Sequence, residues 1–118
     1  MLKKLRELLA TPIAELDAER LREFCAGQTA CTPISSLEPR RPGTIAGEIS
    51  SLRIVPHDGS PWLEATITDG TGTMIAMWTG RRRIAGIAPG KRLMVTGRMA
   101  PSGMSSRLMV YNPAYELL

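Results

Sequence analysis

The chain has 118 residues, 43% of them hydrophobic, and a net charge of +4. This length fits one domain core and is too short for two. There is no apolar run of about 20 residues and no signal-peptide pattern at the start, which predicts a cytoplasmic protein without a membrane span. The whole charge excess lies in residues 41–118. It favours an anionic partner such as nucleic acid, or it serves solubility alone.

The first 27 residues carry helical patterns. Leucines at positions 2, 5, 8 and 9 form the stripe of a short amphipathic helix over 2–9. Pro12 interrupts this pattern, and a second helix is predicted over 13–26 with Gly27 as its stop. We expect the N-terminal helical segment, 1–27, to pack against the domain or against another subunit. Residues 28–43 are rich in Gly, Pro, Ser and Thr and are predicted to be a linker.

Residues 44–118 change to the alternating pattern of strands and are predicted to form a barrel. Gly47 suits a bend in the first strand, and residues 69–72, DGTG, are typical of a tight hairpin turn. The predicted elements are strands at 44–55, 62–68 and 73–79, a short helix at 80–88, strands at 91–99 and 107–111, and a tail at 112–118. This is the element order of the OB fold. We therefore predict an all-β domain with short N-terminal helices: a five-stranded OB-fold β-barrel with a short helix between strands three and four.

Patterns for catalysis or metal binding are missing from the sequence. His57 stands beside Asp58 without a nucleophile near it in the sequence. Residues 86–91, GIAPGK, differ from a phosphate-binding loop in spacing, and Arg92 stands where that loop needs Ser or Thr. Cys25 and Cys31 lack the paired spacing of zinc ligands and are expected to be reduced. We predict that the protein is not an enzyme and needs no cofactor or metal.

Basic residues of the barrel are the candidates for a binding function. The densest cluster, at 81–83, is expected at one end of the barrel, where its guanidinium groups would contact phosphate or form a solvated turn. Trp62, at the mouth of a loop, would stack on a base or serve the structure, whereas Trp78 is expected in the core. The predicted nucleic-acid-binding residues are Arg81, Arg82, Arg83, Lys91, Arg92, Arg98, Arg107 and Trp62.

The outer face of the second and third strands supports a different function. This face is expected to carry Glu64, Thr66, Thr68, Ile75 and Met77, which include an acid and no base. Ile75 and Met77 exposed together would form an apolar patch, covered by the N-terminal helices or by another protein. The alternative is therefore a protein-interaction or oligomerisation module that uses this face and the helices.

Four motifs between Gly43 and Glu116 carry a family resemblance. They are Gly-x-Ile-x-Gly-x-Ile, Leu-x-Ala-x-Ile-x-Asp-Gly-Thr-Gly with Met-x-Ala-x-Trp, Pro-Gly-Lys-Arg-Leu-x-Val-x-Gly-Arg, and Leu-x-Val-Tyr-Asn-Pro-x-Tyr-Glu. The chain resembles OB-fold nucleic-acid-binding domains, above all the wedge domain of RecG-type DNA helicases. Its layout is similar to that of small stand-alone OB-fold proteins of actinobacteria.

The resemblance implies a non-catalytic protein that binds nucleic acid through the rim loops at 56–61 and 101–106. The implied ligand is single-stranded or branched DNA, or RNA, and DNA is favoured over RNA. The sequence shows no motor and no ATP site, so unwinding is not implied.

Overall fold

The computed structural model describes residues 13–102 and 107–118 of the chain. The helix predicted at 2–9 and most of the loop at 101–106 lie outside these residues. The second predicted helix is present as α2 (Ile13–Ala26), and the N–H of Gly27 donates to the carbonyl of Glu23 at 3.2 Å where the helix ends. A short 3-10 helix, η1 (Ile34–Ser36), lies in the stretch predicted as linker. In the part of the chain that the structure describes, no helix is long and apolar enough to cross a membrane.

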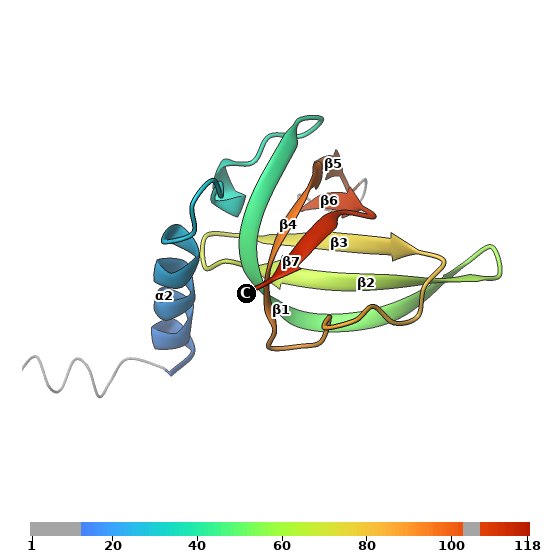
Figure 1. Ribbon diagram of the computed structural model, residues 1–118, viewed down its shortest axis with the longest axis horizontal. Helices are drawn as coiled ribbons and strands as arrows, with labels where there is room; N and C mark the ends of the chain where they lie inside the picture. Colours follow the sequence, from blue (N-terminus) through green and yellow to red (C-terminus); the bar gives the residue numbers. More distant parts are fainter. Residues whose placement is uncertain (1–12, 103–106) are drawn as a thin grey trace, which may run out of the picture.

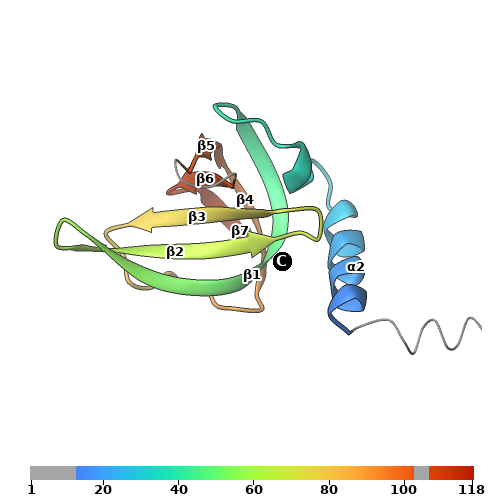
Figure 2. The same cartoon turned by 180° about the vertical axis from the view of Figure 1, so that it is seen from behind.

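The rest of the described chain forms one mostly antiparallel sheet that curls into a half-barrel (Figures 1 and 2). Among the strands of residues 13–102 and 107–118, only β3 and β6 pair in parallel. The predicted strands at 44–55, 62–68 and 73–79 are confirmed within two residues at each end. The strands are β1 (Pro42–His57), β2 (Ser60–Thr68), β3 (Thr73–Thr79), β4 (Arg92–Arg98), β5 (Ala100–Pro101), β6 (Leu108–Tyr111) and β7 (Ala114–Leu117), and their order in the sheet is β5-β6-β3-β2-β1-β4-β7.

The described residues form seven strands where five were predicted, because a further short strand follows each of the last two predicted strands. The fourth is interrupted at Met99, whose N–H donates to the carbonyl of Arg41 at 2.9 Å and whose carbonyl accepts from the N–H of Arg40 at 2.7 Å. The chain then resumes as β5. The strand predicted at 107–111 ends at Tyr111, before Asn112, which has a φ of 47°, and Pro113; a further strand, β7, follows in the predicted tail. Since β5 continues β4 and pairs with β6, the chain passes from β4, next to one end of the sheet order, to β5 at the other end.

The helix predicted at 80–88 does not form. Residues 80–91 make turns, and Gly80, Gly86 and Gly90 have φ values of 72°, 78° and 85°. A right-handed helix contains no residue with such a φ. A residue distant in the sequence holds this connection: the hydroxyl of Tyr115 in β7 donates to the carbonyl of Ala85 at 3.0 Å. Among the described residues, the α-helix therefore precedes the sheet.

β1 is the longest strand because it belongs to both halves of the sheet. Its first part pairs with β4 and its second part with β2, and Glu48 is paired in both ladders. A Cβ at Gly47 would stand 2.5 Å from Cγ2 of Ile67, so the close approach of the strands here requires glycine. The register then shifts between Ile49 and Ser51, which is a bulge. The predicted bend near Gly47 is confirmed (Figure 1).

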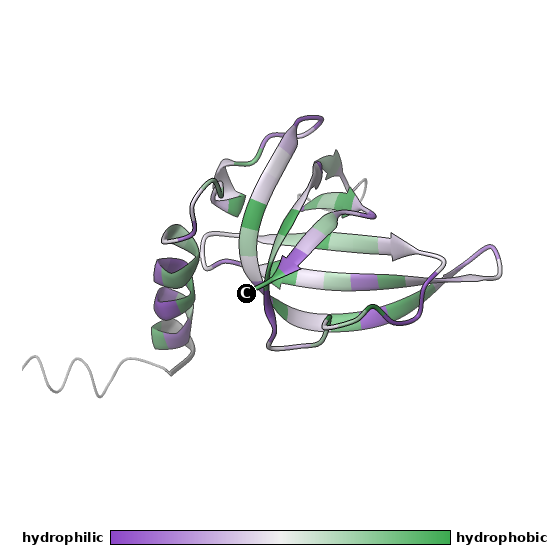
Figure 3. Cartoon of the chain, viewed as in Figure 1, coloured by the Kyte–Doolittle hydropathy of each residue, from purple (hydrophilic) through white to green (hydrophobic). Residues whose placement is uncertain are grey.

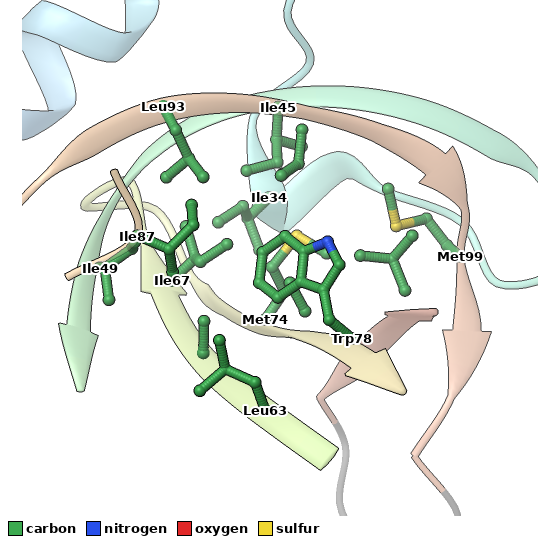
Figure 4. Packing of buried hydrophobic residues seen from close by; sticks show 14 residues of the cluster. Ile34, Ile45, Ile49, Leu63, Ile67, Met74, Trp78, Ile87, Leu93 and Met99 are labelled. Atoms are coloured by element: carbon green, nitrogen blue, oxygen red, sulfur yellow. The ribbon is translucent and has the colours of Figure 1, made fainter. Parts of the chain in front are cut away.

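Alternation along the strands places one face of the sheet in the core (Figure 4). Trp78 lies within this cluster, and its ring stands 5.9 Å from that of Tyr115 at an interplanar angle of 80°. The predicted position of Trp78 in the core is therefore confirmed. The inward side chains of β2 and β3 are all at most 5% exposed, and they are Leu63, Ala65, Ile67, Met74, Ala76 and Trp78.

A buried carboxylate joins η1 to the turn between β2 and β3. Asp69 is 3% exposed, and its Oδ2 accepts from the N–H of Ile34 at 2.8 Å. Its Oδ1 accepts from the N–H and the hydroxyl of Thr71 at 2.9 and 2.6 Å, and from the N–H of Gly72 at 3.1 Å. The tight turn predicted at 69–72 is present, and it also holds Ile34 in the core.

α2 packs on the outer side of β1 and β4. Leu21 and Cys25 are buried against Ala46 of β1. The guanidinium carbon of Arg92 in β4 lies 4.4 Å from the ring centroid of Phe24, within the range of a cation–π interaction. The helix stands at the end of the sheet that holds the β2–β3 turn, far from the tip of the β1–β2 hairpin (Figures 1 and 2).

Candidate nucleic-acid interface

The outer face of the sheet carries aromatic residues near the tip of the β1–β2 hairpin. Trp62 of β2 is paired with Thr79 of β3. One residue pair further along this face, Met77 of β3 lies between Glu64 of β2 and Tyr111 of β6. Because side chains alternate along each strand, Trp62 and Tyr111 project from the same face.

Three rings, which we call the ring cluster, meet there: His57, Trp62 and Tyr111. The rings of His57 and Trp62 are stacked, with centroids 4.1 Å apart and an interplanar angle of 17°. The ring of Tyr111 stands at 81° to that of Trp62, at 6.3 Å. Trp62 is half-buried and has one face covered by His57, whereas Tyr111 is 48% exposed. Tyr111 and His57, whose side chain is 54% exposed, are therefore the two rings of the cluster that are open to a stacking base, although the sequence pointed to Trp62.

Two turns hold the ring cluster in place. Asp58 and Gly59 have φ values of 50° and 78°, the signature of a two-residue type I′ hairpin turn, so β1 and β2 extend further than predicted and carry His57 to the tip. Behind Tyr111, the Oδ1 of Asn112 accepts from the N–H of Thr79 at 2.9 Å. This bond ties the end of β6 to β3 and fixes the position of the Tyr111 ring.

The apolar patch predicted on this face does not form. Met77 is 5% exposed and Ile75 is half-buried. The reason is that β6 lies beside β3 and places Met109 and Tyr111 opposite these two residues. The alternation of residues within β2 and β3 distinguishes the inner face of the sheet from the outer face. It does not predict which strand pairs with the free edge of β3. The covering strand is β6, and α2 packs elsewhere.

The acid on this face has a basic partner on the neighbouring strand. Glu64 of β2 is opposite Arg53 of β1. The guanidinium donates from Nε to Oε1 at 3.0 Å and from Nη2 to Oε2 at 3.2 Å, which is a two-point contact. In the sequence, the second and third strands carry an acid and no base on this face, and the base that pairs with Glu64 comes from β1. The pair reduces the repulsion that Glu64 would exert on a phosphate.

Arg81, Arg82 and Arg83 follow β3 directly, at the hairpin end of the sheet. Thr79, the partner of Trp62, precedes them by two residues, so the chain carries the three arginines past the ring cluster. All three are exposed. Within residues 13–102 and 107–118, none of these side chains takes part in an ion pair or a hydrogen bond. In Figure 3 the tip of the β1–β2 hairpin is hydrophilic, whereas the strands carry most of the hydrophobic colour.

Two further predicted cations lie at opposite ends of β6. Arg98, at the end of β4, is exposed and lines a hollow together with Tyr111. Arg107 immediately precedes β6, is exposed, and lines a different hollow that includes Ser35 and Thr73. Since β6 runs parallel to β3, Arg107 is at the β2–β3 turn and Arg98 is on the side of the ring cluster.

Lys91 and Arg92 lie at the beginning of β4, at the far end of the 80–91 connection from Arg81. Lys91 is exposed. Arg92 is half-buried, and its Nε donates to Oε1 of Glu48 at 3.4 Å while its guanidinium covers Phe24. The structure thus brings Arg81–Arg83, Arg98 and Trp62 toward one region and places Lys91, Arg92 and Arg107 elsewhere.

The two cysteines are unpaired thiols. Cys25 and Cys31 are free thiols, and no cluster of three or more metal-ligating side chains occurs in the described part of the chain. Burial, with a smaller contribution from the nearby Asp69 charge, raises the pKa of the Cys25 thiol to about 11. Burial also raises the pKa of Cys31. Both thiols therefore stay protonated at neutral pH, and a protonated thiol is a poor metal ligand and nucleophile.

No family model and no curated protein matches the chain. Solved structures do. A domain of replication protein A from Methanococcus maripaludis aligns with a TM-score of 0.61 at 18% identity, over 74% of this chain and 93% of that one. RecG bound to a three-way DNA junction aligns with a TM-score of 0.61 at 20% identity, over 75% of this chain and 12% of RecG. The replication factor A related protein from Methanobacterium thermoautotrophicum gives 0.56 at 18% identity, over 76% and 92%.

At these identities the likeness identifies the fold. It agrees with the sheet order, with the parallel β3–β6 pairing and with the curled, mostly antiparallel sheet. The chain is therefore an OB-fold domain preceded by an N-terminal helix.

Proposed function

We propose that the protein binds single-stranded or branched DNA, without catalysing a reaction, on the outer face of the sheet beside the β1–β2 hairpin. The observation that carries this proposal is the juxtaposition of an exposed aromatic ring, Tyr111, with three exposed arginines, 81–83, whose side chains have no ion-pair partner among the described residues. Non-specific binding of single strands combines these two elements: rings on which bases stack and cations that follow the phosphates.

The electrostatics of this face favour a polyanion. Arg53 pairs with Glu64, the acid of the outer face of β2. The exposed arginines at 81–83 add an uncompensated positive charge next to the ring cluster. Each phosphate that they neutralise releases counterions, which drives binding at low salt.

The remaining predicted cations have different parts in this proposal. Arg98 belongs to the same region as Tyr111. Lys91 and Arg107 lie outside that region and would raise the affinity through longer-range attraction. Arg92 mainly holds α2 on the sheet. DNA is favoured over RNA because one structural neighbour, RecG, is bound to a DNA junction, and we expect the protein to act in the cytoplasm.

Fluorescence anisotropy with labelled single-stranded DNA, junction DNA, duplex DNA and RNA at two salt concentrations tests the proposal. We expect single-stranded or junction DNA to bind most tightly. The variant Arg81→Ala/Arg82→Ala/Arg83→Ala should weaken binding and reduce the slope of log K against log salt by about 2, since each single-strand phosphate contact contributes about 0.7. A control variant with the same net charge, Arg20→Ala/Arg22→Ala/Arg41→Ala, should bind nearly as tightly as the parent protein.

The alternative, a protein-interaction or oligomerisation module, loses its main support because Met77 is buried. It is still an outcome of the same experiment. If no nucleic acid binds at low salt and the protein forms a stable dimer instead, the proposed function is wrong.

A further inference from the structure

A hollow beside the ring cluster is lined by two arginines and an aromatic ring. Its lining comes from the segment before β1, from the end of β4 and β5, and from the end of β6. Arg40 and Arg98 are both exposed, and Tyr111 is 48% exposed. The lining residues are Arg40, Arg98, Met99, Ala100, Pro101 and Tyr111. This lining combines two positive charges with an apolar floor and one open ring.

The backbone holds Arg40 rigidly at the rim of this hollow. Its N–H donates to the carbonyl of Met99 at 2.7 Å, and its φ is 66°. A non-glycine residue in this left-handed region is strained, and such strain occurs where the surrounding structure fixes the backbone. Arg98 approaches from the other side, on the strand residue paired with Pro42. The backbone positions of Arg40 and Arg98 are therefore both set by hydrogen bonds or strand pairing.

Neither arginine forms an ion pair with an acid in the part of the chain that the structure describes. None of the residues that line the hollow is a carboxylate. The nearest acid in the sequence, Glu38, pairs with Arg41 at 3.0 Å instead. Two like charges that share one hollow repel each other, and an anion between them removes that repulsion. Guanidinium groups bind phosphate through several parallel hydrogen bonds, which makes phosphate the anion that fits best.

We propose that this hollow binds one nucleotide of a single strand, with its phosphate between Arg40 and Arg98 and its base against the exposed part of the Tyr111 ring. The proposal rests on the function proposed above and adds a subsite to it. Ala100 and Pro101 supply the apolar surface beside the base. The strand would then run from the arginines at 81–83, past the ring cluster, to this hollow.

Single substitutions test the subsite against a matched control. Affinity for a labelled oligothymidylate of about eight nucleotides is measured by anisotropy at several salt concentrations. Arg40→Ala and Arg98→Ala should each weaken binding by about tenfold and reduce the salt slope by about 0.7. Arg41→Ala removes the same charge next to Arg40, but its side chain is paired with Glu38, so it should change the affinity by less than about twofold.

The salt dependence of binding distinguishes the contribution of the Tyr111 ring from that of the two arginines. Tyr111→Leu should weaken binding by about tenfold and leave the salt slope unchanged, because it removes a stacking surface and no charge. Urea unfolding of each variant verifies that the fold is intact. If the parent protein binds and Arg40→Ala and Arg98→Ala behave like Arg41→Ala, the subsite is wrong and the proposed function stands. If the parent protein binds no oligonucleotide at low salt, both proposals fail.

Discussion

Replacing Asp69 tests whether the carboxylate between η1 and the β2–β3 turn stabilises the fold. Asp69→Ala removes four accepted hydrogen bonds. The bond from the N–H of Ile34 is buried, and leaving a buried N–H without a partner costs about 1–3 kcal/mol. The bonds from Thr71 and Gly72 are partly buried. Water replaces these in part, so each contributes about 0.5 kcal/mol.

Together these contributions give a loss of about 3–4 kcal/mol for Asp69→Ala. This is a large part of the roughly 5–15 kcal/mol by which domains of this size are stable. Asp69→Asn retains an acceptor for Thr71 and Gly72 and turns its amide group toward Ile34. It should lose about 1–2 kcal/mol.

Urea unfolding followed by tryptophan fluorescence measures these losses, since Trp78 is buried in the core. The control is Asp58→Asn, because the side chain of Asp58 is 96% exposed and makes only a 3.6 Å contact with His57. It should change the free energy of unfolding by less than about 0.5 kcal/mol. A loss below about 1 kcal/mol for Asp69→Ala, with an unchanged m-value, would refute the structural role assigned to this carboxylate.

Three further predictions concern the bend, a thiol and the end of β6. Gly47→Ala should destabilise the fold by about 2 kcal/mol in the same assay, because its Cβ would stand 2.5 Å from a methyl group of Ile67; an effect near zero would show that the strands can separate without cost. Because the pKa of Cys25 is raised from 9.0 to about 11, the native state keeps this proton longer than the unfolded state, so stability should fall as the pH rises from 9 to 11. Cys25→Ala should lose less stability than the parent over that range, and an equal loss would contradict the assignment. Asn112→Ala should lower the free energy of unfolding by about 1–2 kcal/mol and also weaken oligonucleotide binding, because the residue after Tyr111 loses its hydrogen bond to Thr79. Unchanged binding would show that this hydrogen bond does not contribute to the binding site.

The elements predicted correctly are those whose signal is local. The helix over 13–26 has both its apolar stripe and its stop in its own sequence, and β2 and β3 show uninterrupted alternation around a turn of four polar and glycine residues. For the same reason Trp78 could be assigned to the core. Such patterns do not depend on which distant segment lies alongside.

The errors concern features that distant contacts decide. The basic run at 81–83 followed by Ile84 and Ile87 has helical spacing, but Gly80 and Gly86 adopt positive φ and Tyr115 binds the connection from β7. Residues 112–118 were expected to be a tail, yet β7 within them pairs with β4, a strand that begins about 20 positions earlier.

The candidate site could be predicted only in part. Arg81–Arg83 stand out in the sequence as a cluster, and the structure leaves them exposed. The stacking of His57 on Trp62, the exposure of Tyr111 and the nearness of Arg40 depend on the hairpin turn and on the order of the strands. The sequence signal for Tyr111 was its place before Asn-Pro, where β6 ends.

Because Glu48 is paired with both β2 and β4, the half of the sheet that contains β2 and the half that contains β4 should fold together. β1 pairs with β2 in one half and with β4 in the other, so both strands lose these backbone hydrogen bonds when β1 detaches. The ladder with β4 joins residues between 44 positions (Glu48 and Arg92) and 56 positions (Pro42 and Arg98) apart, which slows folding because a long loop must close before the pairing is formed. Intermediates with only one half of the sheet would leave an unpaired edge on β1. The protein should therefore unfold in a single cooperative transition and refold slowly for its size.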